Sequence, residues 1–95
     1  MPTQSTEDYL KAIYEMVCEG GQEWASTTGL ARALELAPAS VTAMLKKLAA
    51  AEPPLVQHEL YQGARLTEAG ERSALEVVRH HRLIERHLLR GSPGG

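Results

Sequence analysis

Two side chains near the C-terminal end of the chain have the chemistry and the spacing of a metal-binding pair. His81 and Glu85 are four residues apart in a stretch, residues 68–90, whose pattern predicts one long helix. Residues at this spacing lie on the same face of a helix, so an imidazole nitrogen and a carboxylate oxygen could bind one divalent cation together. Two ligands do not complete a metal site, and on an arginine-rich helix such a pair is more often a solvated ion pair. Both interpretations stay open on the residues alone.

The stretch from Leu30 to Leu48 predicts two short amphipathic helices with a break at Ala37 and Pro38. Proline lacks the amide hydrogen that a helix interior needs but fits the first helical turn, so the second helix should begin at about residue 38 or 39. This arrangement is typical of a helix-turn-helix. Apolar residues recur at helical spacing on both sides of the break, at Leu30, Ala33 and Leu34 and again at Val41, Leu45 and Leu48.

The outward positions of the second helix suit the major groove of DNA. Small or hydroxyl side chains lie near its N-terminal end and two ammonium groups near its C-terminal end: Ala39, Ser40, Thr42, Ala43, Lys46 and Lys47. We assign base reading to Ser40, Thr42 and Ala43, with the Ala43 methyl group available to thymine, and phosphate contacts to the two lysines. Packed amphipathic helices also occur in all-α domains that never touch nucleic acid, so this segment alone does not decide between the two.

Two short β segments follow the second helix, LVQHEL at residues 55–60 and RLT at residues 65–67, around a glycine-containing turn. A hairpin directly after a recognition-type helix is a wing, which lies along the phosphate backbone or the minor groove. Gln62 and Arg65 are therefore candidate phosphate contacts. For Arg65, an ordinary exposed strand residue is an equally good interpretation.

Further predictions concern the elements that support this unit. The first helix should end at Gly20 and Gly21, and Thr27 or Thr28 should cap the next helix. Trp24 should cover the core or lie in the first strand of the winged sheet. The expected buried positions are Leu10, Ile13, Tyr14 and Val17 on the first helix and Leu75, Val78, Leu83 and Leu89 on the last.

The fold class that follows is mainly α. We expect a winged helix-turn-helix, with three helices and a β-hairpin wing, followed by one long C-terminal helix. The 95 residues would then divide into a DNA-binding domain over residues 1–67, the long helix over residues 68–90 and a flexible tail over residues 91–95.

Composition and charge argue against several classes of protein. The single cysteine has no partner for a disulfide and no apolar run reaches membrane-spanning length, so we expect a soluble cytoplasmic protein without membrane contact. An enzyme is not expected, because the chain has no nucleophile with a placed base and no glycine-rich phosphate loop. Residues 1–36 carry six acidic against two basic side chains, whereas residues 37–95 carry eight basic against six acidic ones, for a net charge of −2. Such weak basicity predicts few phosphate contacts per subunit, and therefore a need for a dimer or for a charge-neutralising ligand to reach useful affinity.

Four segments in series, STEDYLKAIYEM, LARALELAPASVTAMLKKL, YQGARLTEAG and RHHRLIERHLL, resemble parts of a known family. It is the diphtheria-toxin-repressor family of metal-dependent transcription regulators, and the similarity is to the N-terminal half of its manganese-transport-regulator branch. The resemblance covers residues 5–90. It implies a homodimer that binds a double-stranded DNA operator as a repressor of metal-uptake genes when Mn(II) or Fe(II) is bound, with residues 68–90 at the start of the dimerisation region.

The same resemblance implies metal ligands at Asp8, His81 and Glu85. The manganese branch has a second acidic ligand three residues after the aspartate, where this chain has Lys11, whose ammonium group would repel a cation. Any binuclear centre is therefore expected to be lost or altered. The sequence also ends before the helices that provide further ligands in the family, so we expect weak metal affinity and a weak or absent metal response. Two alternatives stay open: a winged-helix DNA binder that needs no metal, and a short interaction form that heterodimerises with a full-length relative.

Overall fold

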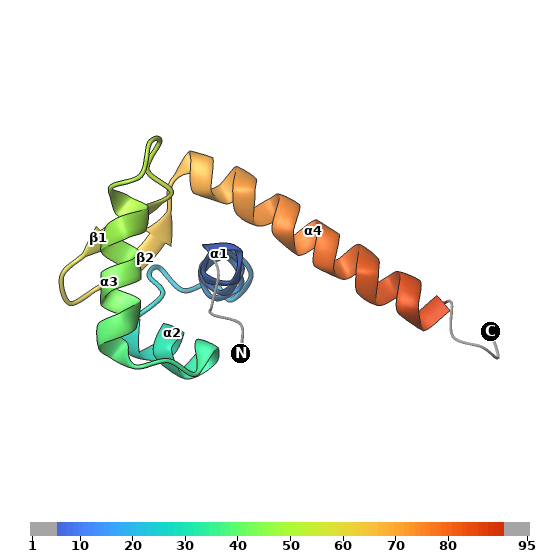
Figure 1. The fold of residues 1–95 in the computed structure, drawn as a ribbon, viewed down its shortest axis with the longest axis horizontal. Coiled ribbons are helices and arrows are strands. Elements are labelled where there is room, and N and C mark those ends of the chain that lie inside the picture. Colours follow the sequence, from blue (N-terminus) through green and yellow to red (C-terminus); the bar gives the residue numbers. More distant parts are fainter. Residues whose placement is uncertain (1–5, 91–95) are drawn as a thin grey trace.

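The computed structural model describes residues 6–90, and for residue 81 and residues 84–90 it describes the backbone alone. A bundle of short helices and one hairpin forms a body from which the last helix projects (Figure 1), so that the molecule measures 50 × 28 × 25 Å. The elements in chain order are α1 (Thr6–Tyr14), the π-helical segment η1 (Glu15–Glu19), α2 (Thr27–Leu34), α3 (Pro38–Ala49), β1 (Val56–Glu59), β2 (Gly63–Leu66) and α4 (Glu68–Arg90). The predicted fold class, a mainly helical winged helix-turn-helix followed by a long helix, is confirmed.

Helix α1 supplies the centre of the core and contacts α2, β2 and α4. Leu10 and Ile13 are buried, and Tyr14 and Val17 pack half-buried against the same cluster, as their spacing predicted. The helix ends at Gly20 as expected, although its last turn widens into η1. The backbone N–H of Gly20 closes that turn on the carbonyl of Glu15, at 2.7 Å.

Helix α2 begins one or two residues earlier than predicted. Ser26, not Thr27 or Thr28, is its N-cap: its backbone is extended and its Oγ accepts a hydrogen bond from the backbone N–H of Gly29 at 2.9 Å. An extended residue whose hydroxyl reaches the third following amide satisfies one of the free donors at a helix start. The two threonines lie inside the helix.

The buried face of α2 also differs from the prediction. Leu30 and Ala31 are buried and Leu34 is half-buried against the core, whereas Ala33 is exposed. Successive helical residues are about 100° apart, so a face centred on Leu34 includes residues 30 and 31 and leaves residue 33 to one side. The predicted stripe was therefore wrong at Ala33.

Helix α3 agrees with its prediction. Ala37 has an extended backbone, and Pro38 occupies the first turn, where its missing N–H costs nothing. The predicted apolar stripe is fully buried against α2 and β1, at Val41, Leu45 and Leu48.

The predicted hairpin is present as an antiparallel pair of strands, in which Gln57 faces Arg65. A backbone bridge joins the segment before α2 to β2: the N–H of Ala25 donates to the carbonyl of Ala64 at 2.8 Å, and the reverse bond measures 2.9 Å. Ala25 thus pairs with β2 as a residue of a further strand would. Trp24 is its neighbour in the chain, as one of the two interpretations of Trp24 predicted, and it is half-buried.

Helix α4 packs on α1 (Figure 1). Its predicted apolar seam was partly wrong. Val78 is buried and Leu75 is half-buried, but the other buried apolar side chains in the described part of α4 are those of Ala74 and Val77. Leu83 is 62% exposed. The side chain of Leu89 and the predicted tail at residues 91–95 lie outside the described residues.

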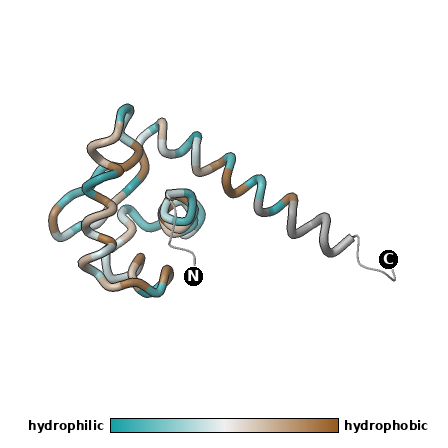
Figure 2. Tube along the Cα trace, in the orientation of Figure 1, coloured by the Kyte–Doolittle hydropathy of each residue, from teal (hydrophilic) through white to brown (hydrophobic). Residues whose placement is uncertain are grey.

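Hydrophilic and hydrophobic residues alternate along the coloured part of α4 instead of forming one apolar run (Figure 2). Within the part of the chain that the structure describes, no helix combines the length and the hydrophobicity that crossing a membrane requires.

Candidate nucleic-acid interface

The face of α3 opposite its buried stripe is open to solvent. Ala39, Ser40 and Ala43 at the N-terminal end and Lys46 and Lys47 at the C-terminal end are all exposed. Thr42 is half-buried, so it is the least accessible of the predicted base-reading residues. The exposed face thus carries small side chains first and two cations after them, on a rigid helix anchored by buried residues, which is the order expected for entry into a major groove.

Three of these residues border a shallow hollow of about 380 Å³ between α1 and α3. Ser40, Ala43 and Lys47 lie at helical spacings of three and four residues and form one wall. The remaining lining residues are Tyr9, Leu36 and Met44. Burial raises the pKa of the Tyr9 phenol above its ordinary value, so it stays a neutral hydroxyl at the base of the hollow.

The wing lies beside α3, because β1 packs against that helix (Figure 1). At its tip, Gln62 is exposed, as a phosphate contact would have to be. Leu60 and Tyr61 precede it and are 73% and 97% exposed, and Tyr61 has a positive φ of 70°. The tip therefore presents polar and apolar groups to solvent together.

Arg65 is half-buried on β2 and is held by two neighbours. Its Cζ lies 4.4 Å from the centre of the Trp24 ring, and its Nε–H donates to Oε1 of Gln57 at 3.1 Å. It is therefore more than the ordinary exposed strand residue that was one of its two interpretations. The roles of Trp24 and Gln57 were missed from the sequence, because nothing local to either residue indicates that it meets Arg65.

Comparison with known proteins agrees with this geometry. Residues 1–64 match the family described as iron dependent repressor, N-terminal DNA binding domain. The chain belongs to this family. The match includes α3 and the first strand and turn of the wing, which are the elements described above.

Several relatives of the chain carry the name HTH-type transcriptional regulator MntR. The chain is 40% identical over 85 residues to that of Shouchella clausii (strain KSM-K16), which covers 90% of this chain and 57% of the relative. It is 36% identical over 88 residues to that of Lysinibacillus sphaericus (strain C3-41), covering 93% of this chain and 60% of the relative. The protein of Geobacillus thermodenitrificans (strain NG80-2) is 39% identical over 88 residues, with the same coverage of 93% and 60%. The chain thus spans less than two thirds of the length of these relatives.

The residues to which the diphtheria-toxin-repressor resemblance assigned a metal are only partly described. Asp8 is half-buried in the first turn of α1, and the half-buried Lys11 lies one turn further along the same face. The side chains of His81 and Glu85 lie outside the described residues. Among the side chains that are described, no three acidic, histidine or cysteine groups are placed to hold a metal ion. One carboxylate with an ammonium group nearby fits a divalent cation poorly, because the ammonium group opposes its charge.

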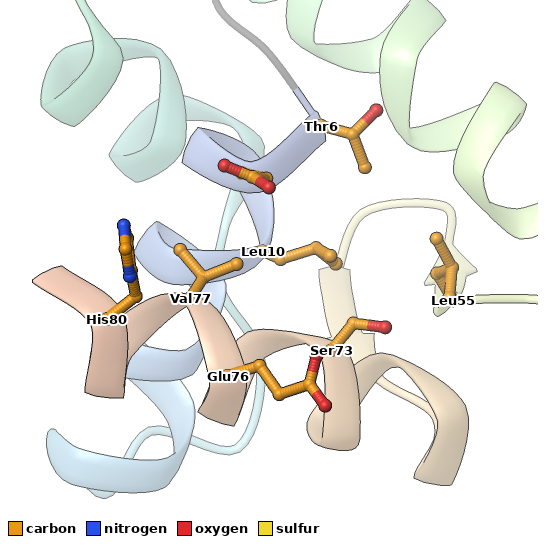
Figure 3. A pocket seen from close by; sticks show the side chains of 8 residues that line it. Thr6, Leu10, Leu55, Ser73, Glu76, Val77 and His80 are labelled. Atoms are coloured by element: carbon orange, nitrogen blue, oxygen red, sulfur yellow. The ribbon is translucent and has the colours of Figure 1, made fainter.

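A separate pocket of about 530 Å³ lies between α1 and α4 (Figure 3). Its walls combine apolar, hydroxyl and ionisable side chains, namely Thr6, Glu7, Leu10, Leu55, Ser73, Glu76, Val77 and His80. His80 and Glu76 both come from α4, and His80 is the neighbour in sequence of the predicted ligand His81. Since Glu7, Glu76 and His80 do not form a metal-binding group, the pocket does not replace the predicted metal site.

Proposed function

We propose that this chain is a DNA-binding transcriptional regulator, a repressor, that recognises a double-stranded operator through α3 and the wing. The observation that carries the proposal is the exposed face of α3, with Ser40 and Ala43 ahead of Lys46 and Lys47, on a helix that packs directly against the first wing strand. The family match over residues 1–64 and the regulators among its relatives support the same function. In this proposal the chain acts by binding DNA and has no catalytic role.

In this proposal the residues divide by task. Ser40, Thr42 and Ala43 approach base edges in the major groove, while Lys46 and Lys47 approach phosphates, which fix the register of the protein on the duplex. Ala39 contributes a small surface at the start of the helix, and Gln62 and Arg65 extend the phosphate contacts along the wing. Because the whole chain has a net charge of −2, we infer that two copies act together as a homodimer to reach useful affinity in the cytoplasm.

The metal response belongs to the same proposal. The family resemblance makes Mn(II) or Fe(II) the co-repressor and metal-uptake genes the targets, with Asp8, His81 and Glu85 as ligands. Lys11 stands on the face of α1 that Asp8 occupies, so metal binding by this chain is expected to be weak and to change DNA affinity little. Tight, stoichiometric Mn(II) binding that is lost in His81→Ala would contradict the expected weak metal binding. It would leave the proposed DNA binding untouched.

The direct test uses fluorescence anisotropy with a randomised, AT-rich duplex pool at low and moderate salt, with and without Mn(II), followed by sequencing of the bound fraction. We expect enrichment of a palindromic sequence, binding that weakens as salt rises, and little change on adding Mn(II). Absence of binding at low salt would overturn the proposed function. A pool that was bound without any sequence enrichment would leave a non-specific DNA binder and overturn operator recognition.

A further inference from the structure

We propose that Trp24, Gln57 and Arg65 form a site for one DNA backbone phosphate on the wing. Arg65 is the phosphate ligand, while Trp24 and Gln57 are positioning residues that hold its guanidinium group. The inference deepens the proposed function and rests on it, since the phosphate belongs to the bound duplex.

The strand register brings the three side chains together. Gln57 is the partner of Arg65 across β1 and β2. On the other side of β2, the bridge between Ala25 and Ala64 makes residue 24 the next antiparallel neighbour of residue 65. Arg65 therefore has a cross-strand neighbour on each side, and side chains paired in this way project from the same face of a sheet. The contacts follow from backbone pairing that is anchored by hydrogen bonds of 2.8 and 2.9 Å.

The two contacts restrain different motions of Arg65. The Trp24 ring, 4.4 Å from Cζ, fixes the position of the guanidinium group above an aromatic face. The bond from Nε–H to Oε1 of Gln57, at 3.1 Å, fixes its direction along the sheet. A long side chain normally loses conformational freedom when it binds a ligand, and a side chain already held in place loses less.

The held guanidinium group retains both the charge and the donors that a phosphate needs. Its partners are an aromatic face and an amide oxygen, and none of the ion pairs among the described side chains involves it, so its positive charge is not neutralised. The bond to Gln57 uses the Nε–H, and the two terminal nitrogens of an arginine carry four further N–H groups. A planar pair of such donors matches two phosphate oxygens.

The position of the site on the fold selects DNA as the source of the phosphate. β1, which carries Gln57, packs against α3, whose outward lysines are the proposed phosphate contacts of the recognition helix. A second phosphate contact on the wing would hold the protein at two separate points along the duplex. Such contacts orient a recognition helix without reading sequence.

The test measures affinity for a fixed AT-rich duplex as a function of salt for wild type, Arg65→Ala, Trp24→Leu and the double variant. Arg65→Ala should lower the salt slope by about one unit. Trp24→Leu should weaken binding by about threefold to tenfold, the cost of ordering one long side chain. If Trp24 acts through Arg65, the double variant should bind no worse than Arg65→Ala, because the two effects share one contact.

One conservative change and one truncation separate a positioning role from an effect on stability alone. The folded Trp24→Leu variant should show a smaller salt slope, because Arg65 is no longer held, and Trp24→Tyr, which keeps an aromatic face, should restore the wild-type slope. A role in packing alone would leave the slope unchanged in every folded Trp24 variant, Trp24→Leu included. Should Trp24→Leu fail to fold, Gln57→Ala, at an exposed strand position, supplies the second measurement and should also weaken binding. Additive losses in the double variant, or an unchanged slope in Arg65→Ala, would overturn the phosphate site.

The outcomes also separate this site from the proposed function. If wild type binds no duplex at low salt, the proposed function itself is wrong. If wild type binds the duplex, and Lys47→Ala weakens that binding while Arg65→Ala does not, then the proposed role of α3 in DNA binding is supported. Only the phosphate site on the wing is overturned in that case.

Discussion

The carbonyl oxygen of Ala25 fills the space next to Gly63 that a side chain would need. A Cβ atom on Gly63 would overlap that oxygen, and it would lie 2.8 Å from Cα of Ser26. Gly63 also has a φ of +111°, a region that other residues rarely adopt. The bridge between Ala25 and Ala64, which places Trp24 against Arg65, therefore depends on glycine at the start of β2.

Gly63→Ala should destabilise the protein by about 2 to 5 kcal/mol, the sum of backbone strain and overlap with a backbone that has little room to move. Gly21→Ala is the matched control, because Gly21 also has a positive φ, of +76°, but an added Cβ there meets nothing within 4 Å. It should cost about 1 kcal/mol. Urea unfolding followed by circular dichroism gives both values. Equal losses in the two variants would contradict the close approach at Gly63.

Ser26→Ala should destabilise the protein by about 1 kcal/mol, because the backbone N–H of Gly29 would lose the Oγ that accepts its hydrogen bond at the start of α2. Thr28→Ala is the control, since Thr28 is exposed within the helix and its replacement should change stability by less than about 0.5 kcal/mol. Thermal unfolding of both variants compares them directly. A larger loss of stability in Thr28→Ala than in Ser26→Ala would contradict Ser26 as the N-cap and favour Thr28, one of the two caps predicted from the sequence.

The elements of this fold could be predicted from sequence where a local pattern decides them. The break at Pro38 and the buried stripe of α3 follow from proline chemistry and helical spacing, and the structure has both. The cap of α2 was misplaced because Ser26, Thr27 and Thr28 all have hydroxyls suited to capping. Only the backbone conformation, extended at Ser26 and helical after it, chooses among them.

The buried face of α4 could not be predicted because its partner is far away in the sequence. Leu75, Val78 and Leu83 form a reasonable stripe, yet Ala74 and Val77 are buried and Leu83 is 62% exposed. A small side chain such as that of Ala74 allows two helices to approach, and hydrophobicity alone does not reveal this.

The contacts of Arg65 on the wing could not be predicted from the sequence either. Arg65 was chosen from its charge and its place on the hairpin, and it does lie there. Its contact with Trp24 depends on the bridge between Ala25 and Ala64, which joins segments far apart in the sequence. No spacing along the chain predicts that pairing.

Lys47→Ala should weaken binding to every duplex to a similar extent and lower the salt slope by about one unit, because an exposed lysine on α3 contacts phosphate and not a base. Arg72→Ala is the control: it removes the same charge from α4, where Arg72 is 79% exposed and pairs with Glu68. Its effect on the slope should be smaller. Fluorescence anisotropy over a salt series measures both. Equal slopes in the two variants would show that net charge, and not position on α3, governs binding.

The thiol of Cys18 should react slowly with alkylating reagents near neutral pH. Partial burial raises its pKa, and the carboxylate of Glu71, whose Oε2 lies 3.8 Å from Sγ, raises it further through its charge and by accepting the S–H hydrogen bond. A raised pKa means less thiolate, the reactive form, at any pH below it.

Glu71→Gln should therefore lower the pKa of Cys18, although not fully to its ordinary value, because the effect of burial remains. Alkylation by iodoacetamide, followed by mass spectrometry across neutral and alkaline pH, should show faster reaction near neutrality and a midpoint at lower pH. Glu68→Gln is the matched control: Glu68 lies on the same helix and pairs with Arg72, so its replacement should leave the profile of Cys18 unchanged. An identical midpoint in wild type and Glu71→Gln would show that Glu71 does not govern the pKa of the thiol and that the contact between Cys18 Sγ and Glu71 Oε2 is not maintained in solution.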